Sequence, residues 1–146
     1  MPKVKLKKQK KYDFNYKTTI KVRDINYGGH LSNDSLVGLL HEARIDLLKQ
    51  MGFGELNLGD QKTGIIMTDL VVNFRNQGYM HDEITIQSQI DEISSVGFRV
   101  FHQILKEETL IGLAEIGIVC FNYQDNQIAD VPEVFLQTLE QFQKDC

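Results

Sequence analysis

Residues 34–51 read DSLVGLLHEARIDLLKQM, and this stretch decides the fold. Its apolar residues recur at spacings of four, three, four and four, which places them on one continuous face of a helix. They are Leu36, Leu40, Ala43, Leu47 and Met51. Other apolar residues of the stretch lie elsewhere on the cylinder, and such a helix is typically buried. We therefore predict a long buried helix over residues 34–51, capped by Ser32 or Asn33 and ended by Gly52.

On either side of this helix the pattern changes to the period of two that is typical of strands. Before it, a strand is predicted over residues 18–23, followed by a loop with two adjacent glycines, Gly28 and Gly29. After it, a loop over residues 53–63 precedes four more predicted strands. These span residues 65–74, 84–90, 96–104 and 110–123. The breaks between the four strands are too short for parallel crossovers, so the strands are expected to pair antiparallel.

A last helix is predicted over residues 132–143, because Pro132 suits the first turn of a helix. The order is then one strand, one buried helix, about four strands and a terminal helix. A buried helix must pack on a face of the mostly antiparallel sheet. The sequence therefore predicts an α+β fold.

The chain has 146 residues, which suits one domain with a core of its own. No stretch approaches the roughly 20 apolar residues of a membrane span, and no secretory signal is expected at the start. Cys120 and Cys146 form no disulfide or zinc-binding pattern, so we expect no metal site. Two thiols without such a framework favour a reducing, cytoplasmic location.

Charge divides the chain into a short basic arm, residues 1–12, and a single acidic domain, residues 13–146. The arm carries six lysines, and the rest of the chain carries ten basic and twenty acidic side chains. Such an acidic domain repels a phosphate backbone, which argues against nucleic-acid binding. The arm offers contacts to an anion, but a charge run at a terminus is more typical of a solvated, frayed end.

Polar residues gather at the start of the buried helix, around a glycine-containing loop. Asn26, His30 and Asn33 lie here, and Glu42 follows on the helix. The first N–H groups of a helix have no intrahelical partner and lie at the positive end of its dipole. Such a site can polarise a carbonyl or hold an oxyanion, which suits attack on an acyl group.

The segments IKVR (residues 20–23), DINYGGHLSN (residues 24–33) and HEAR (residues 41–44) resemble the 4-hydroxybenzoyl-CoA thioesterase-like family of the hotdog-fold superfamily. The later strands resemble it too, over about residues 17–135 in all. The resemblance implies a curved antiparallel sheet wrapped around one long central helix. It also implies a homodimer or homotetramer that hydrolyses an acyl-CoA, with no cofactor because coenzyme A belongs to the substrate.

The resemblance also assigns roles to four residues, with one departure. The family's catalytic Asp is replaced here by Asn26, and an amide cannot act as a general base. Asn33 matches the backbone donor at the helix start, His30 the loop histidine and Glu42 the helix acid. Asn26 is also a common turn residue, and an acid such as Glu42 is more often a structural partner of Arg44 or another basic group.

Two functions therefore remain open, and a third is weaker. The first is thioester hydrolysis, with Glu42 or Asp24 standing in as the base. The second is binding of an acyl-CoA or acyl chain without hydrolysis, since the family Asp is missing. A hotdog dehydratase is the weak alternative, because no Pro follows His30. For the phosphates of CoA, Arg75, Lys62 and the lysines of the arm are all candidates.

Overall fold

The computed structural model describes residues 4–144; Lys3 of the predicted arm and Cys146 lie outside them. A strand and a short 3-10 helix precede the long helix, and four long strands, a two-residue strand and a second helix follow it. In chain order the elements are β1 (Phe14–Thr19), a 3-10 helix (Val22–Asp24), α1 (Asn33–Gln50), β2 (Thr63–Phe74), β3 (Glu83–Asp91), β4 (Gly97–Lys106), β5 (Thr109–Asn122), β6 (Gln127–Ile128) and α2 (Glu133–Lys144).

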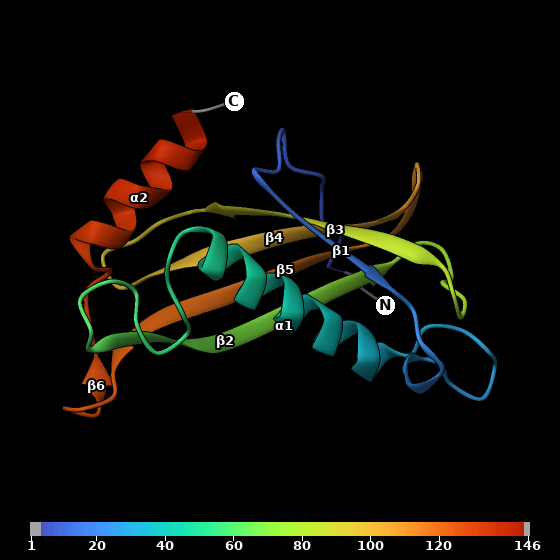
Figure 1. The fold of residues 1–146 in the computed structure, drawn as a ribbon, viewed down its shortest axis with the longest axis horizontal. Helices are drawn as coiled ribbons and strands as arrows, with labels where there is room; N and C mark the ends of the chain where they lie inside the picture. The colour runs from blue at the N-terminus through green and yellow to red at the C-terminus, as the bar shows by residue number, and fades with distance from the viewer. Residues whose placement is uncertain (1–3, 145–146) are drawn as a thin grey trace.

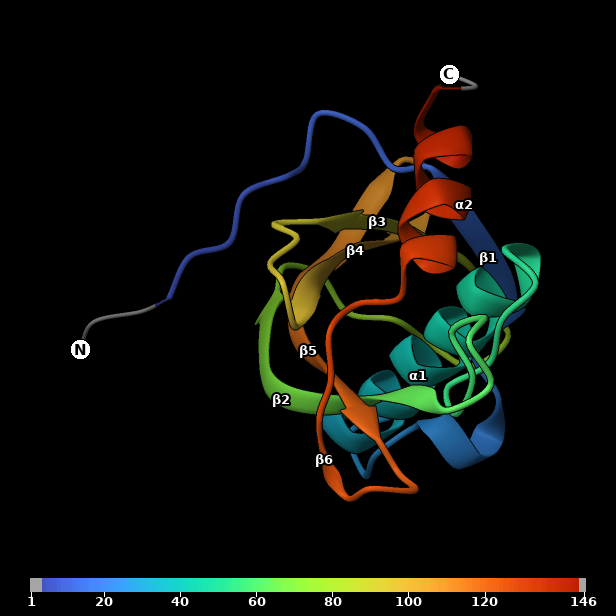
Figure 2. The same cartoon turned by 90° about the vertical axis from the view of Figure 1, so that its left-hand side faces the viewer.

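The strands form one antiparallel sheet in the order β1-β3-β4-β5-β2, with β6 paired to β5. β1 and β2 are therefore the two outer strands. The sheet curves around α1, which lies along its inner face (Figures 1 and 2). The predicted α+β arrangement is confirmed: a curved antiparallel sheet enclosing one long helix.

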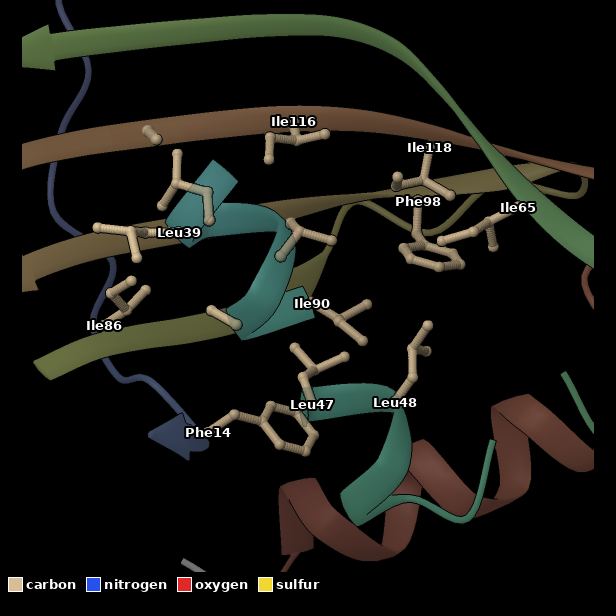
Figure 3. Close-up of a cluster of buried hydrophobic side chains, with 14 of the residues drawn as sticks. Phe14, Leu39, Leu47, Leu48, Ile65, Ile86, Ile90, Phe98, Ile116 and Ile118 are labelled. Atoms are coloured by element: carbon tan, nitrogen blue, oxygen red, sulfur yellow. The ribbon is translucent and has the colours of Figure 1, made fainter. Parts of the chain in front are cut away.

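The core lies between α1 and the inner face of the sheet. Ile90, Val100 and Ile116 face α1 from three adjacent strands, because the register pairs Ile90 with Val100 and Val100 with Ile116. Leu47 and Leu48 meet this layer from the helix (Figure 3). Cys120 is fully buried, and this burial raises the pKa of its thiol to about 12, so it packs as a small apolar residue.

The second helix closes one end of the core through aromatic contacts. Phe135 is fully buried and stacks on Phe98, with ring centroids 5.2 Å apart, and its ring lies 5.5 Å from that of Phe53. Phe142 stacks on Phe14 of β1 at 5.3 Å. The observed helix begins one residue after Pro132, as the proline predicts.

Three details differ from the sequence prediction. The strand predicted over residues 18–23 ends at Thr19, because Asp24 accepts a hydrogen bond from the Lys21 N–H (2.8 Å) and turns the chain into a 3-10 helix. The two-residue β6 was not predicted. Finally, α1 is buried on one side only, since Glu42 and Ile45 are exposed in the single chain.

Candidate functional site

The loop between β1 and α1 is held in shape by hydrogen bonds to the side chains of Asp24 and Asn26. Asp24 is buried and turns its carboxylate back onto the Lys21 N–H. Its carbonyl accepts from the Ser32 N–H (2.8 Å), which brings the two ends of the loop together. Asp24 is therefore a structural residue of the loop, and its carboxylate does not line the hollow described below.

Asn26 holds the loop by its side-chain oxygen. Its Oδ1 accepts from the N–H groups of Gly28 (2.9 Å) and His30 (3.2 Å). Gly29 completes the turn at φ +79°, a backbone conformation that favours glycine. Because Oδ1 is used by the backbone, the orientation of the amide is fixed and its Nδ2 is left as a donor. The turn predicted for Asn26 is thus present, and it leaves two N–H bonds available to a ligand.

His30 lies beside the connection between β2 and β3. Its ring meets that of Tyr79 edge to face, with centroids 5.2 Å apart, and the two residues form an isolated β-bridge. The next residue, Leu31, donates its N–H to the Gly78 carbonyl (2.8 Å). These contacts place the imidazole against residues far away in sequence, about 50 positions along the chain.

The start of α1 presents a backbone donor at Asn33. Ser32 is the cap, because its hydroxyl accepts from the Ser35 N–H (3.3 Å). Asp34 also lies in this first turn, where a hydrogen bond from the Ser32 hydroxyl lowers the pKa of its carboxyl. Among the described residues no group accepts a hydrogen bond from the Asn33 N–H. This N–H is the first of the helix, and it belongs to the end of the helix at which the dipole is positive.

These pieces border a single hollow of about 350 Å³. Its walls come from the loop, the first turn of α1, the end of β2, the β2–β3 connection and β5. The lining residues are Asn26, His30, Leu31, Asn33, Phe74, Arg75, Asn76, Gln77, Gly78 and Ile111. No carboxylate is among them, so the hollow is lined by amide and imidazole side chains, one cation and apolar surface.

The structure thus brings together three of the four predicted site residues and places the fourth elsewhere. Glu42 lines a separate hollow on the exposed side of α1, together with His41, Ile45 and Lys49. It accepts a hydrogen bond from the Tyr16 hydroxyl (2.8 Å), which raises the pKa of that tyrosine. It lies nine positions after Asn33 on the helix, about 14 Å along the axis.

The predicted pairing of Glu42 with Arg44 is replaced by a different ion pair. Arg44 donates from Nε to Glu55 (2.9 Å), and Glu55 also contacts His41 Nε2 (2.8 Å). Burial opposes ionisation of Glu55, but the hydrogen bonds from His41 and Arg44 outweigh it and lower the pKa of its carboxyl. This network fastens the loop after α1 to the helix.

Arg75 was predicted as one of several phosphate candidates, and the structure places it in the hollow. Its neighbours Asn76, Gln77 and Gly78 were not predicted as site residues. Their only signal is the break between two predicted strands, which does not say what the break will face. Within residues 4–144, no group of three or more His, Cys, Asp or Glu side chains is arranged to hold a metal. The described helices are too short or too polar to cross a membrane.

The chain matches one protein-family model and a set of solved structures. A family model described as the thioesterase-like superfamily matches residues 20–139. No curated protein sequence matches the chain.

Among solved structures the fold recurs in several thioesterases. A gentisyl-coenzyme A thioesterase is 20% identical, covers 86% of this chain and 98% of its own, and has a TM-score of 0.76. A 1,4-dihydroxy-2-naphthoyl-CoA thioesterase from Synechocystis is 17% identical, with coverages of 86% and 94% and a TM-score of 0.77. A hypothetical protein from Staphylococcus aureus, solved in complex with CoA, is 14% identical, with coverages of 90% and 84% and a TM-score of 0.81. At these identities the likeness establishes the hotdog fold.

Proposed function

Because the chain belongs to the thioesterase-like superfamily, we propose that it hydrolyses the thioester of an acyl-CoA to a free acid and CoA. The observation that carries this proposal lies at the start of α1: the Asn33 N–H has no acceptor among the described residues, and Asn33 lines the same hollow as Asn26 and His30. A thioester carbonyl entering this hollow meets a positive helix end rather than a carboxylate. The narrower resemblance to the 4-hydroxybenzoyl-CoA branch stays a prediction.

In the proposed reaction a water molecule adds to the thioester carbon, and negative charge develops on the carbonyl oxygen. The Asn33 N–H and the helix dipole stabilise that charge, and the Asn26 Nδ2 supplies a second donor. The carbon–sulfur bond then breaks, and the CoA sulfur leaves and takes up a proton. His30 positions the reactants at the wall of the hollow. No cofactor is required, because CoA is part of the substrate.

Among the described residues no carboxylate lines the hollow of one chain, so none there takes the proton from water. Asp24 is committed to the loop. Glu42 lies on the other side of its own helix, so it serves this reaction only from a second subunit. The role of Glu42 stays a prediction, tested by comparing Glu42→Gln with wild type: a loss of kcat at unchanged KM supports it.

Thiol release from a panel of acyl-CoAs tests the proposed activity. The panel begins with aromatic acyl groups, since two of the structural relatives are named for aromatic acyl-CoA substrates, and extends to alkyl chains. We expect release above the uncatalysed rate for at least one member. No turnover with any of them would contradict hydrolysis.

Binding without hydrolysis is the second candidate, favoured by the absence of a carboxylate in the hollow. Replacing Asn26 with Asp separates the two. Hydrolysis that appears only in Asn26→Asp identifies the native protein as a binder. A wild type that is already active, with a variant no faster, identifies the amide as part of a working site.

We also propose a homodimer or homotetramer. Within residues 4–144, β2 ends the sheet with an unpaired edge, and Ile66 and Met67 on it are exposed. Unpaired edges of this length favour pairing with another strand. Light scattering after size exclusion measures the mass and distinguishes monomer, dimer and tetramer. A cytoplasmic location remains a prediction from the sequence.

A further inference from the structure

Arg75 stands where the candidate site continues into two further hollows. One, of about 550 Å³, runs along β2 to Lys5 of the N-terminal arm. The other, of about 460 Å³, lies between the β2–β3 connection and the turn between β4 and β5. The Arg75 side chain is exposed, and among the described residues it has no ion pair or side-chain hydrogen bond. An unpaired guanidinium at such a junction is available to an anion.

The two hollows differ in their charge. Of the described residues that line the hollow along β2, Lys5 and Arg75 are the charged ones, beside an apolar wall that includes Val71 and Phe74. The other hollow contains Lys106, but this ammonium is 2.9 Å from the carboxylate of Asp82. Glu107 adds a further negative charge there. An anionic ligand leaving the site is therefore favoured to follow β2 rather than the β4–β5 turn.

The arm is fastened to the sheet at the residues that flank Lys5. The Asn73 Oδ1 accepts from the Leu6 N–H (2.6 Å), and the Asn73 Nδ2 donates to the Val4 carbonyl (2.8 Å). One amide side chain therefore brackets Lys5 on both sides. The arm runs over the outer side of the sheet, opposite α1 (Figure 2). Lys5 is exposed and has no ion pair within the described residues, so its charge is also available.

We propose that Lys5 and Arg75 bind the phosphates of the CoA nucleotide, which makes the basic arm a part of the substrate site. Both groups are cationic donors, and a guanidinium matches phosphate oxygens with two parallel hydrogen bonds. Phe74 lines both this hollow and the site, so an apolar surface continues from one to the other. Lys62, the remaining candidate from the sequence, lines neither this hollow nor the site.

Calorimetric binding of CoA and of pantetheine, its phosphate-free counterpart, tests the assignment. We expect wild type to bind CoA more tightly than pantetheine. Lys5→Gln and Arg75→Gln are each expected to raise the Kd for CoA by roughly three- to tenfold and to leave the Kd for pantetheine unchanged. Lys62→Gln removes the same charge elsewhere and is expected to bind CoA as wild type does. All three side chains are exposed, so folding should be retained.

Three results would overturn the assignment. They are an unchanged Kd for CoA in both Lys5→Gln and Arg75→Gln, an equal loss of pantetheine binding, and binding of an acidic acyl carrier protein in place of CoA. The inference rests on the proposed function, but the two fail separately. If CoA binding depends on the phosphates but no thiol is released, the proposed hydrolysis is contradicted and the phosphate assignment is kept. If acyl-CoA is hydrolysed but the Kd for CoA is unchanged in both variants, the phosphate assignment is contradicted and the proposed hydrolysis is kept.

Discussion

His102 makes the stability of the fold depend on pH in a calculable way. The side chain is 1% exposed on the inner face of β4, and its Nδ1 lies 2.6 Å from the Ser88 hydroxyl. Burial, and secondly the positive charge of Arg44, lower the pKa of this imidazole from 6.5 to about 3. It therefore stays neutral in the folded protein at pH values where the unfolded chain binds a proton.

The sign follows from proton binding. Between pH 6.5 and pH 3 the unfolded state binds more protons at this residue, so stability falls as pH falls. At pH 5 the loss attributable to His102 is about 2 kcal/mol relative to pH 8. Urea unfolding of wild type and His102→Gln at both pH values isolates this residue, because the other titrations cancel in the comparison. We expect wild type to lose about 2 kcal/mol more than the variant. Equal losses would refute the burial of a neutral imidazole.

Three further predictions concern the elements that hold the site. Phe135→Ala removes a fully buried ring that stacks on Phe98 and should cost about 3–5 kcal/mol in urea unfolding; a cost under 1 kcal/mol would contradict the role of α2 in closing the core. Ser32→Ala removes the cap of α1 and should cost about 1 kcal/mol by the same measurement, with Ser35→Ala as the control that keeps the backbone donor. Gly97→Ala places a Cβ against the Ile118 carbonyl oxygen and should cost about 1–3 kcal/mol, whereas Gly38→Ala, with open space around it, should not destabilise.

Local patterns were enough to predict most of the fold. The spacing from Leu36 to Met51 identified α1 to within one residue at each end, because apolar periodicity reports burial directly. The predicted end of the strand before α1 was wrong. The apolar alternation continues through Val22, but the Lys21 N–H donates to the Asp24 carboxylate instead of to a neighbouring strand. Such a hydrogen bond depends on the rotamer of one side chain and leaves no periodic pattern in the sequence.

Only the part of the site whose residues lie close together in sequence was predicted. Asn26, His30 and Asn33 lie within eight residues, so their proximity follows from one loop and one helix start. The opposite wall comes from residues 74–78, and only the sheet order β5-β2 brings it there. Glu42 shows the converse, since nearness in sequence did not bring it to the hollow. Whether a residue of this 18-residue helix reaches the hollow depends on which side of the helix faces the sheet.

Removing the backbone donor of Asn33 tests the central claim most directly. Asn33 is the first residue of α1, where proline is tolerated, and Ser32 before it has the extended backbone (φ −81°, ψ 158°) that a following proline requires. Asn33→Pro thus deletes the N–H and leaves the helix in place, while Asn33→Ala deletes only the side chain. With the best acyl-CoA of the panel, we predict that kcat falls about 100- to 1,000-fold in Asn33→Pro and stays near wild type in Asn33→Ala. A folded Asn33→Pro protein that releases thiol at the wild-type rate would contradict the claim.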